Sequence, residues 1–264
     1  MYRFLFSPRW LGFHLLVIVG IVTMVNLGFW QLRRLDERKA FNAEVSERIA
    51  DPPAPLDDVL TPGTDPDRVE WRSVTARGTY LPDEQFLVVN RSQDGIGGTM
   101  VATPMQLADG RVLVVERGFE PGTTAPPAAP TGLVDVVGRL RPSEERHTGQ
   151  LSDPSEGELR EVQRIDIARL SPQLPGPPVP MYVELTASRP AEPTPYPAPV
   201  TLPELTEGPH LSYAVQWFIF SAAVVVGWVL AVRKSLRTRR RGGPPPAAAA
   251  TPEAVAAAPP SSPG

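Results

Sequence analysis

Two uncharged apolar runs, one near each end, dominate the hydrophobic pattern of the chain: residues 11–30 and residues 213–232. A helix rises about 1.5 Å per residue, so each run covers the roughly 30 Å hydrocarbon core of a bilayer. A cleaved signal peptide has a shorter apolar region and a small-residue cleavage site, whereas Gln31-Leu32-Arg33-Arg34 follows the first run. The pattern predicts two uncleaved transmembrane helices, over residues 11–31 and 213–232.

The basic residues predict how these helices are oriented. Arg233, Lys234 and Arg237 follow the second run directly, and no Lys or Arg lies between positions 190 and 211. This asymmetry predicts a cytoplasmic C-terminus, hence a cytoplasmic N-terminus (1–10) and a segment outside the cytoplasm (32–212). Basic residues after the first run argue the other way, but acidic residues are mixed with them and a long segment follows, to which the rule does not apply.

The segment between the runs changes from a helical to a strand-like pattern. Residues 32–50 lack Gly and Pro and predict a helical stem that Asp51-Pro52-Pro53 ends. Asp109-Gly110 predicts a β-hairpin. We therefore expect an antiparallel β-rich core of barrel or sandwich type over about 70–187, followed by a Pro-rich linker (188–212). The strands are expected at 71–81, 86–90, 99–107, 111–119, 133–140, 164–167 and 181–186.

The last stretch, residues 233–264, is basic at first and then rich in Pro and Ala with hardly any charge. Such a sequence has little to bury, so it predicts a disordered cytoplasmic tail. The fold class is thus membrane α + β, with two transmembrane helices flanking an extracytoplasmic β-rich domain.

Composition excludes several kinds of chemistry. The chain has no cysteine, which removes disulfides, thiolate metal sites and cysteine nucleophiles. A net charge of -3 gives no general attraction to nucleic acid. Of the three histidines, none forms an H-x-x-x-H pair, and no G-x-S-x-G elbow exists. We therefore expect a protein that is not an enzyme and that builds no metal site from its side chains alone.

Two histidines lie at the predicted spans: His14 within the first, and His210 at the outer mouth of the second. An imidazole at membrane depth is costly and often functional, and it is a common axial ligand of haem iron. It can equally be a polar residue satisfied near the interface. Taken alone, the residues favour this second role for both histidines.

Polar and small residues gather near the predicted outer side of both spans. Gln31, Arg34 and Gln216 form a polar collar there, and Trp30 lies where aromatic rings prefer the headgroup level. Gly28 would allow the two helices to approach closely. A paired-helix surface that binds a partner and simple interfacial anchoring are both compatible with this pattern.

Five local motifs occur in order, over about residues 10–232. They are Gly28-Phe29-Trp30-Gln31-Leu32-Arg33-Arg34 with the later Lys39, Val74-Thr75-Ala76-Arg77-Gly78-Thr79-Tyr80, Val114-Val115-Glu116-Arg117-Gly118-Phe119, Gly138-Arg139-Leu140-Arg141, and His210-Leu211-Ser212-Tyr213-Ala214-Val215-Gln216-Trp217-Phe218. In these motifs and in its layout the chain resembles the Surfeit locus protein 1 family of cytochrome oxidase assembly factors. It departs from the family pattern in Phe119, where Trp is usual, in Gly208-Pro209 before His210, and in its long tail.

The resemblance implies a role in assembling an aa3-type haem-copper oxidase by aiding haem a insertion into the catalytic subunit. It implies that His210 is an axial ligand of transiently held haem a, with Tyr213 and Trp217, one helical turn apart, packing on the porphyrin. The implied partners are cytochrome c oxidase subunits, above all the catalytic haem-bearing one, the lipid bilayer, and the haem a synthesis machinery.

The residues expected to contact protein partners are Gly28, Trp30, Gln31, Arg34 and Gln216. The high content of Pro, Ala and Arg is typical of a high-GC bacterium, which suggests a bacterial plasma membrane as the location. The alternative function is a structural partner or subunit that stabilises the oxidase or a respiratory supercomplex without binding haem.

Overall fold

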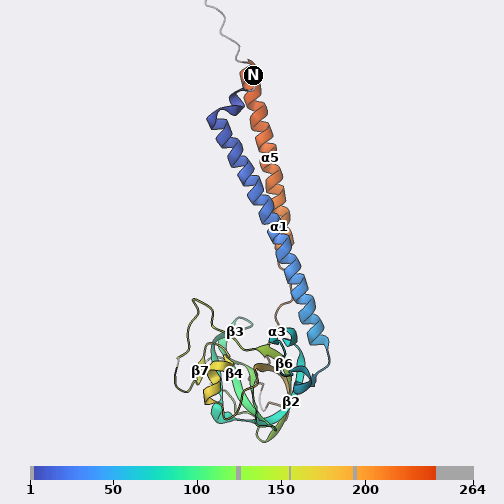
Figure 1. Ribbon diagram of the computed structural model, residues 1–264, viewed down its shortest axis with the longest axis vertical. Helices are drawn as coiled ribbons and strands as arrows, with labels where there is room; N and C mark the ends of the chain where they lie inside the picture. Colours follow the sequence, from blue (N-terminus) through green and yellow to red (C-terminus); the bar gives the residue numbers. More distant parts are fainter. Residues whose placement is uncertain (1–2, 123–125, 155, 193–194, 242–264) are drawn as a thin grey trace, which may run out of the picture. The chain divides into compact units, whose positions relative to one another are not determined.

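The computed structural model of the protein describes residues 3–122, 126–154, 156–192 and 195–241 (Figure 1). The chain divides into two units: a helical unit, made of residues up to 36 and from 208 onward, and a β domain of residues 37–207. The disorder expected for residues 242–264 lies outside the described residues.

The helical unit is a pair of long helices, α1 (Pro8–Ala50) and α5 (His210–Arg241), preceded by the short helix η1 (Arg3–Phe6). They run side by side in opposite directions, since α1 contacts α5 through His14 with Trp228 and through Gln31 with His210 (Figure 1). Both are long and apolar enough to cross a membrane. The sequence prediction of two long apolar helices is confirmed.

Local signals explain where α1 begins and ends. Ser7 accepts the first helical hydrogen bond through its carbonyl, and Pro8 occupies the first turn, where its missing N–H costs nothing. The helix continues beyond the apolar run to Ala50, as the stem prediction requires. Pro52 and Pro53 follow and prevent further helix.

Within the described part of the β domain, eight strands form one sheet in the order β1-β2-β6-β8-β5-β4-β3-β7, with an additional pairing of β2 with β4. That pairing closes β2, β6, β8, β5 and β4 into a barrel, which confirms the barrel-like prediction. The strands are β1 (Ala54–Pro55), β2 (Ser73–Tyr80), β3 (Phe86–Gln93), β4 (Ile96–Leu107), β5 (Val112–Pro121), β6 (Leu133–Pro142), β7 (Glu161–Val162) and β8 (Met181–Arg189). The short helices are α2 (Leu56–Val59), α3 (Pro66–Val69), η2 (Pro82–Glu84), α4 (Ile167–Leu170) and η3 (Ser171–Gln173).

The hairpin expected at Asp109-Gly110 joins β4 to β5, as predicted. The purely antiparallel sheet is wrong in part, because β5 pairs with β8 in parallel, as do β1 with β2 and β3 with β7. A long segment separates β6 from β8, and β8 then lies between β6 and β5 in the sheet. Because β8 is antiparallel to β6, it runs parallel to β5. Such a long-range return leaves no local signal in the sequence.

The strand expected at 164–167 is also wrong. Ile165 and Ile167 are both buried, which produces the alternation typical of a strand. Instead, the Asp166 carboxylate accepts the backbone N–H of Arg169 at 3.0 Å and caps the N-terminus of α4. Capping outweighs the two-residue period here, because it satisfies a helix-end N–H that would otherwise lack a partner.

Strand β5 is buried on both of its faces and separates two apolar cores. Leu113 and Val115 point into the barrel, where they meet apolar side chains from every strand of the ring. Val114 points the other way, into a second core that includes Phe86 and Tyr182. Successive side chains of a strand alternate between faces, so one strand serves both cores.

Two motif glycines lie where the barrel backbone is most constrained. Gly78 pairs with both β6 and β4, at the corner where the ring closes, and a Cβ there would collide with the carbonyl oxygen of Gln106. Gly118 has a φ of +143° and follows Arg117, which is the extra residue in the β4–β5 bulge. Only glycine suits these two positions.

Candidate functional site

His210 is the first residue of α5, and its ring is held by a residue of α1. The distance between His210 Nδ1 and Gln31 Oε1 is 2.8 Å. An amide oxygen only accepts hydrogen bonds, so in the neutral ring Nδ1 carries the proton and Nε2 keeps its lone pair. A hydrogen bond to the other ring nitrogen is the usual means of orienting a metal-ligating imidazole. The arrangement therefore presents Nε2 as a ligand atom.

The approach to Nε2 is kept clear by a glycine. Gly208 has a φ of +67°, and a Cβ built on it would stand 3.5 Å from His210 Nε2. A side chain at position 208 would begin in van der Waals contact with this nitrogen. The glycine of Gly208-Pro209, a departure from the family pattern, thus places no side chain of its own beside Nε2.

His14, the other histidine of the helical unit, has the opposite arrangement. Trp228 Nε1–H donates to His14 Nδ1 at 2.9 Å, so in the neutral ring Nε2 carries the proton. Trp10 and Phe13 also pack around the ring, with centroids 5.5 and 6.1 Å away. This is the environment of a satisfied polar residue, the role that the sequence favoured for His14.

Tyr213 and Trp217 lie on one flank of His210, three and seven residues further along α5. Tyr213 is 46% exposed, so its face is available to a ligand as well as to lipid. Trp217 is partly exposed and packs edge-on against Phe220 at 6.1 Å. The three residues predicted to hold haem therefore share one side of the helix.

The residues predicted to contact partners divide into two groups. Gly28 and Gln31 are used within the helix pair: Gly28 is buried, a Cβ there would lie 2.8 Å from the Phe218 ring, and Gln31 holds His210. Trp30, Arg34 and Gln216 are exposed. The second group remains the part of this prediction that faces outward.

A network of buried charges lies in the β domain, and sequence reasoning did not predict it. Glu184 on β8 accepts a hydrogen bond from Arg139 Nε–H at one oxygen and forms an ion pair with Arg141 Nε at the other, both at 3.1 Å. Arg141 also binds Glu70 at 2.7 Å and stacks on Trp71, 3.7 Å from the ring centroid. Both arginines belong to the G-R-L-R motif, which therefore supplies the ion pairs that tie β6 to β8.

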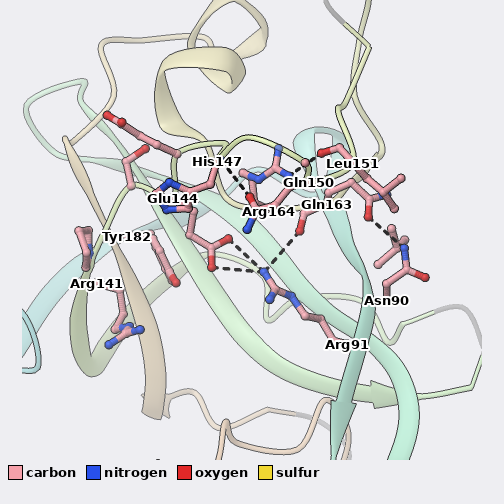
Figure 2. Close-up of a pocket in the computed structure, with 15 residues that line it drawn as sticks. Asn90, Arg91, Arg141, Glu144, His147, Gln150, Leu151, Gln163, Arg164 and Tyr182 are labelled. Carbon is pink, nitrogen blue, oxygen red and sulfur yellow. Dashed lines mark hydrogen bonds and ion pairs between the residues drawn. The ribbon is translucent and has the colours of Figure 1, made fainter. Parts of the chain in front are cut away.

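A cavity of about 700 Å³ borders this network, and Figure 2 shows how its polar side chains converge. Arg91 binds both oxygens of Glu144, at 3.0 and 3.3 Å. Arg164 donates to the Leu151 carbonyl oxygen at 2.6 Å. Arg91, Glu144 and Arg164 are thus already engaged with other groups of the protein, which favours a structural network over a reactive site.

Glu116, on β5, is an unusual acidic group with Glu184 and Glu144 as electrostatic neighbours. Glu116 is only 6% exposed. Burial, and then the neighbouring carboxylates Glu184 and Glu144, raise the pKa of Glu116 to about 8. Burial likewise raises the pKa of the adjacent Tyr182 hydroxyl. The acidic residue inside the V-V-E-R-G-F motif was the available sequence signal, because a charge within an apolar strand calls for a special environment.

Arg117, the next residue, is completely buried. It binds Glu192 through two nitrogens, at 3.1 and 2.5 Å, and donates to Gln85 Oε1 at 3.1 Å. It also donates to two main-chain carbonyl oxygens, at positions 127 and 128. The R-G motif therefore fastens the segment after β8 to the barrel.

Comparison with known proteins gives a consistent result. The chain matches the SURF1 family over residues 18–222. It is similar to a SURF1-like protein of Mycobacterium tuberculosis, with 30% identity over 249 residues, 89% of this chain and 88% of that protein. It is also similar to SURF1-like proteins of Monosiga brevicollis (29% identity; 83% and 87% covered) and Drosophila melanogaster (29% identity; 86% and 79% covered).

Proposed function

The chain belongs to the SURF1 family, which is generally linked to cytochrome oxidase assembly, and from this premise we propose that it holds haem a through His210 and delivers it to the catalytic subunit of an aa3-type oxidase. Its helix pair would sit in a bacterial plasma membrane with both termini in the cytoplasm. It would act as a chaperone that binds and hands over its cargo, with no bond made or broken, and not as an enzyme.

The observation that carries this proposal is the His210–Gln31 contact. The 2.8 Å hydrogen bond fixes the ring and leaves Nε2 with its lone pair, which suits an axial ligand. Haem a would supply an iron that the imidazole nitrogen of His210 could bind. Tyr213 and Trp217 would then pack their rings along the porphyrin.

Release is as important as binding for a delivery protein. One neutral imidazole on the partly exposed end of a helix binds more weakly than a covalent attachment through cysteines, and the chain has no cysteine. The exposed residues Trp30, Arg34 and Gln216 would contact the oxidase while His210 gives up the haem. These contacts belong to the same helix pair as the ligand.

The test is the haem content of the full-length chain, co-expressed with the haem a pathway and purified in detergent. We expect a Soret band that His210→Ala removes. Gln31→Ala should lower the haem affinity about 10- to 100-fold, because loss of a hydrogen bond behind a ligand has effects of that order. His14→Ala is the matched control, since the ring nitrogen that carries the lone pair, Nδ1, is already engaged by Trp228, and its loss should not affect haem.

The alternative is a structural partner that stabilises the oxidase without touching haem. A wild-type protein that carries no haem but still co-purifies with oxidase subunits would favour this alternative and reject delivery. Equal haem loss in the His14 and His210 variants would mean that the helix pair had collapsed, and the ligand assignment would fall.

A further inference from the structure

The C-terminal end of α5 bears a cluster of positive charge that the proposed function does not use. A cavity of about 470 Å³ is lined there by Leu230, Arg233, Lys234, Arg237 and Thr238. All five lining residues belong to one helix, so the hollow is open on its other side. The cavity lies beyond the residues that the family model matches, which end at 222.

The lining residues occupy a single stripe of the helix. Positions 230, 233, 234, 237 and 238 follow the three- and four-residue spacing that places side chains on one face. Arg239 belongs to the opposite face, where its guanidinium stacks 4.3 Å from the centre of the Phe4 ring. The cationic side chains of the cavity therefore share one face of α5 and do not surround the helix evenly.

The three cations of the cavity have no acidic residue to pair with in this part of the chain. Residues 1–35 and 208–241 contain no Asp or Glu. The negative end of the helix dipole acts only within the last turn, and Arg233 lies about 12 Å before the end of α5 at Arg241. An anion from outside the protein would supply the missing charge.

The position along the helix identifies the kind of anion. Val232 is the last residue of the apolar run, and Arg237 lies only about 7.5 Å beyond it along the axis. The lining thus changes from the apolar Leu230 to three cations across the boundary where acyl chains meet headgroups. Leu230 would be irrelevant to free phosphate but would contact the glycerol and upper acyl carbons of a lipid.

We propose that this cavity binds the phosphate headgroup of an anionic phospholipid. Arg233 and Arg237 surround the phosphate oxygens with their forked N–H donors, which match phosphate geometry. Lys234 adds a third positive charge, and Leu230 packs against the lipid below the phosphate. Basic pockets beside membrane helices are known to take such headgroups.

The test is native mass spectrometry of the full-length protein, titrated with phosphatidylglycerol or phosphatidylcholine in detergent. We expect the wild type to retain phosphatidylglycerol selectively. R233Q/K234Q/R237Q should bind it on the order of a hundredfold more weakly, since each of the three ion pairs with the phosphate contributes up to about fivefold. The matched control, R3Q/R9Q/R239Q, removes the same charge from the same end of the helix pair and should lose only a few-fold.

Further variants test the proposal if the lining triple variant fails to insert into the membrane. R233K/R237K keeps every charge and should still lose affinity several-fold, because Lys lacks the bidentate fork. Equal losses in the lining and control triple variants would reduce the site to diffuse helix-end charge and overturn the proposal. Displacement by inorganic phosphate, with Leu230→Asn having no effect, would assign the site to free phosphate and overturn it as well.

Discussion

Protonation of Glu116 should give the β domain a pH-dependent stability that one substitution removes. Burial raises the pKa of Glu116 from 4.5 to about 8 in the folded protein. The native state therefore keeps a proton that the unfolded chain loses above its own pKa. Stability contributed by this group is fully present in acid, falls as the pH rises through the interval between these two values, and is constant above it.

The size of the effect follows from the two pKa values. Between about pH 5 and pH 7 the unfolded carboxyl ionises almost completely, whereas the native one stays mostly protonated. Integration over that interval costs the native state about 2.5 kcal/mol. Glu116→Gln preserves the shape of the protonated acid and cannot ionise, so relative to wild type it should gain about 2.5 kcal/mol over the same interval.

Urea unfolding of the full-length chain in detergent, at a series of pH values, measures this difference. Trp71 is the only tryptophan in residues 37–207, and its ring lies under Arg141, so its emission reports unfolding of the β domain. Glu145→Gln, at an exposed position, is the control and should follow the wild type. Parallel stability curves for wild type and Glu116→Gln would refute the reasoning, because they would require an ionised Glu116 in the native state.

Two further predictions concern glycines with matched controls. Gly118→Ala should destabilise the β domain by about 3 kcal/mol in the same urea assay, because it combines a positive φ with a collision against a main-chain carbonyl. The control Gly122→Ala, also at positive φ but in open space, should cost about 1–2 kcal/mol. Equal costs for the two variants would contradict the collision at Gly118. Gly28→Val should widen the spacing of α1 and α5, because the new side chain would meet the Phe218 ring at 2.8 Å. The spacing is measured between spin labels on introduced cysteines. The control Gly20→Val, at a position with nothing within 4 Å, should leave the spacing unchanged, and a shift there too would count against specific packing at Gly28.

The elements that the sequence predicted well are those whose signals are local. The apolar runs report their own length, the Asp51-Pro52-Pro53 stop ends α1 after Ala50, and Asp109-Gly110 sits at the β4–β5 turn. The predicted strand at 164–167 failed because two signals overlap there: an alternating burial pattern and the capping carboxylate of Asp166. Periodicity counts apolar positions, and it does not register a hydrogen bond from a side chain to the backbone.

The site depends on contacts between residues far apart in the chain, so the sequence could indicate its members but not their roles. Gln31 and His210 are 179 positions apart, and nothing in either motif states that one holds the other. The opposite tautomers of His14 and His210 follow from which partner each ring meets. Likewise, the raised pKa of Glu116 arises from surroundings contributed by several strands and loops.

The place of β8 in the barrel has a consequence for how each molecule is made. Strand β8 lies between β6 and β5, yet it is the last strand of the domain to be synthesised. Until it emerges from the ribosome, both neighbours present edges with unpaired N–H and C=O groups. The ring can close only once the chain has been translated as far as Arg189, about 20 residues before α5 begins at His210. Completion of the barrel and synthesis of the second long apolar helix are therefore neighbouring events in the making of every copy.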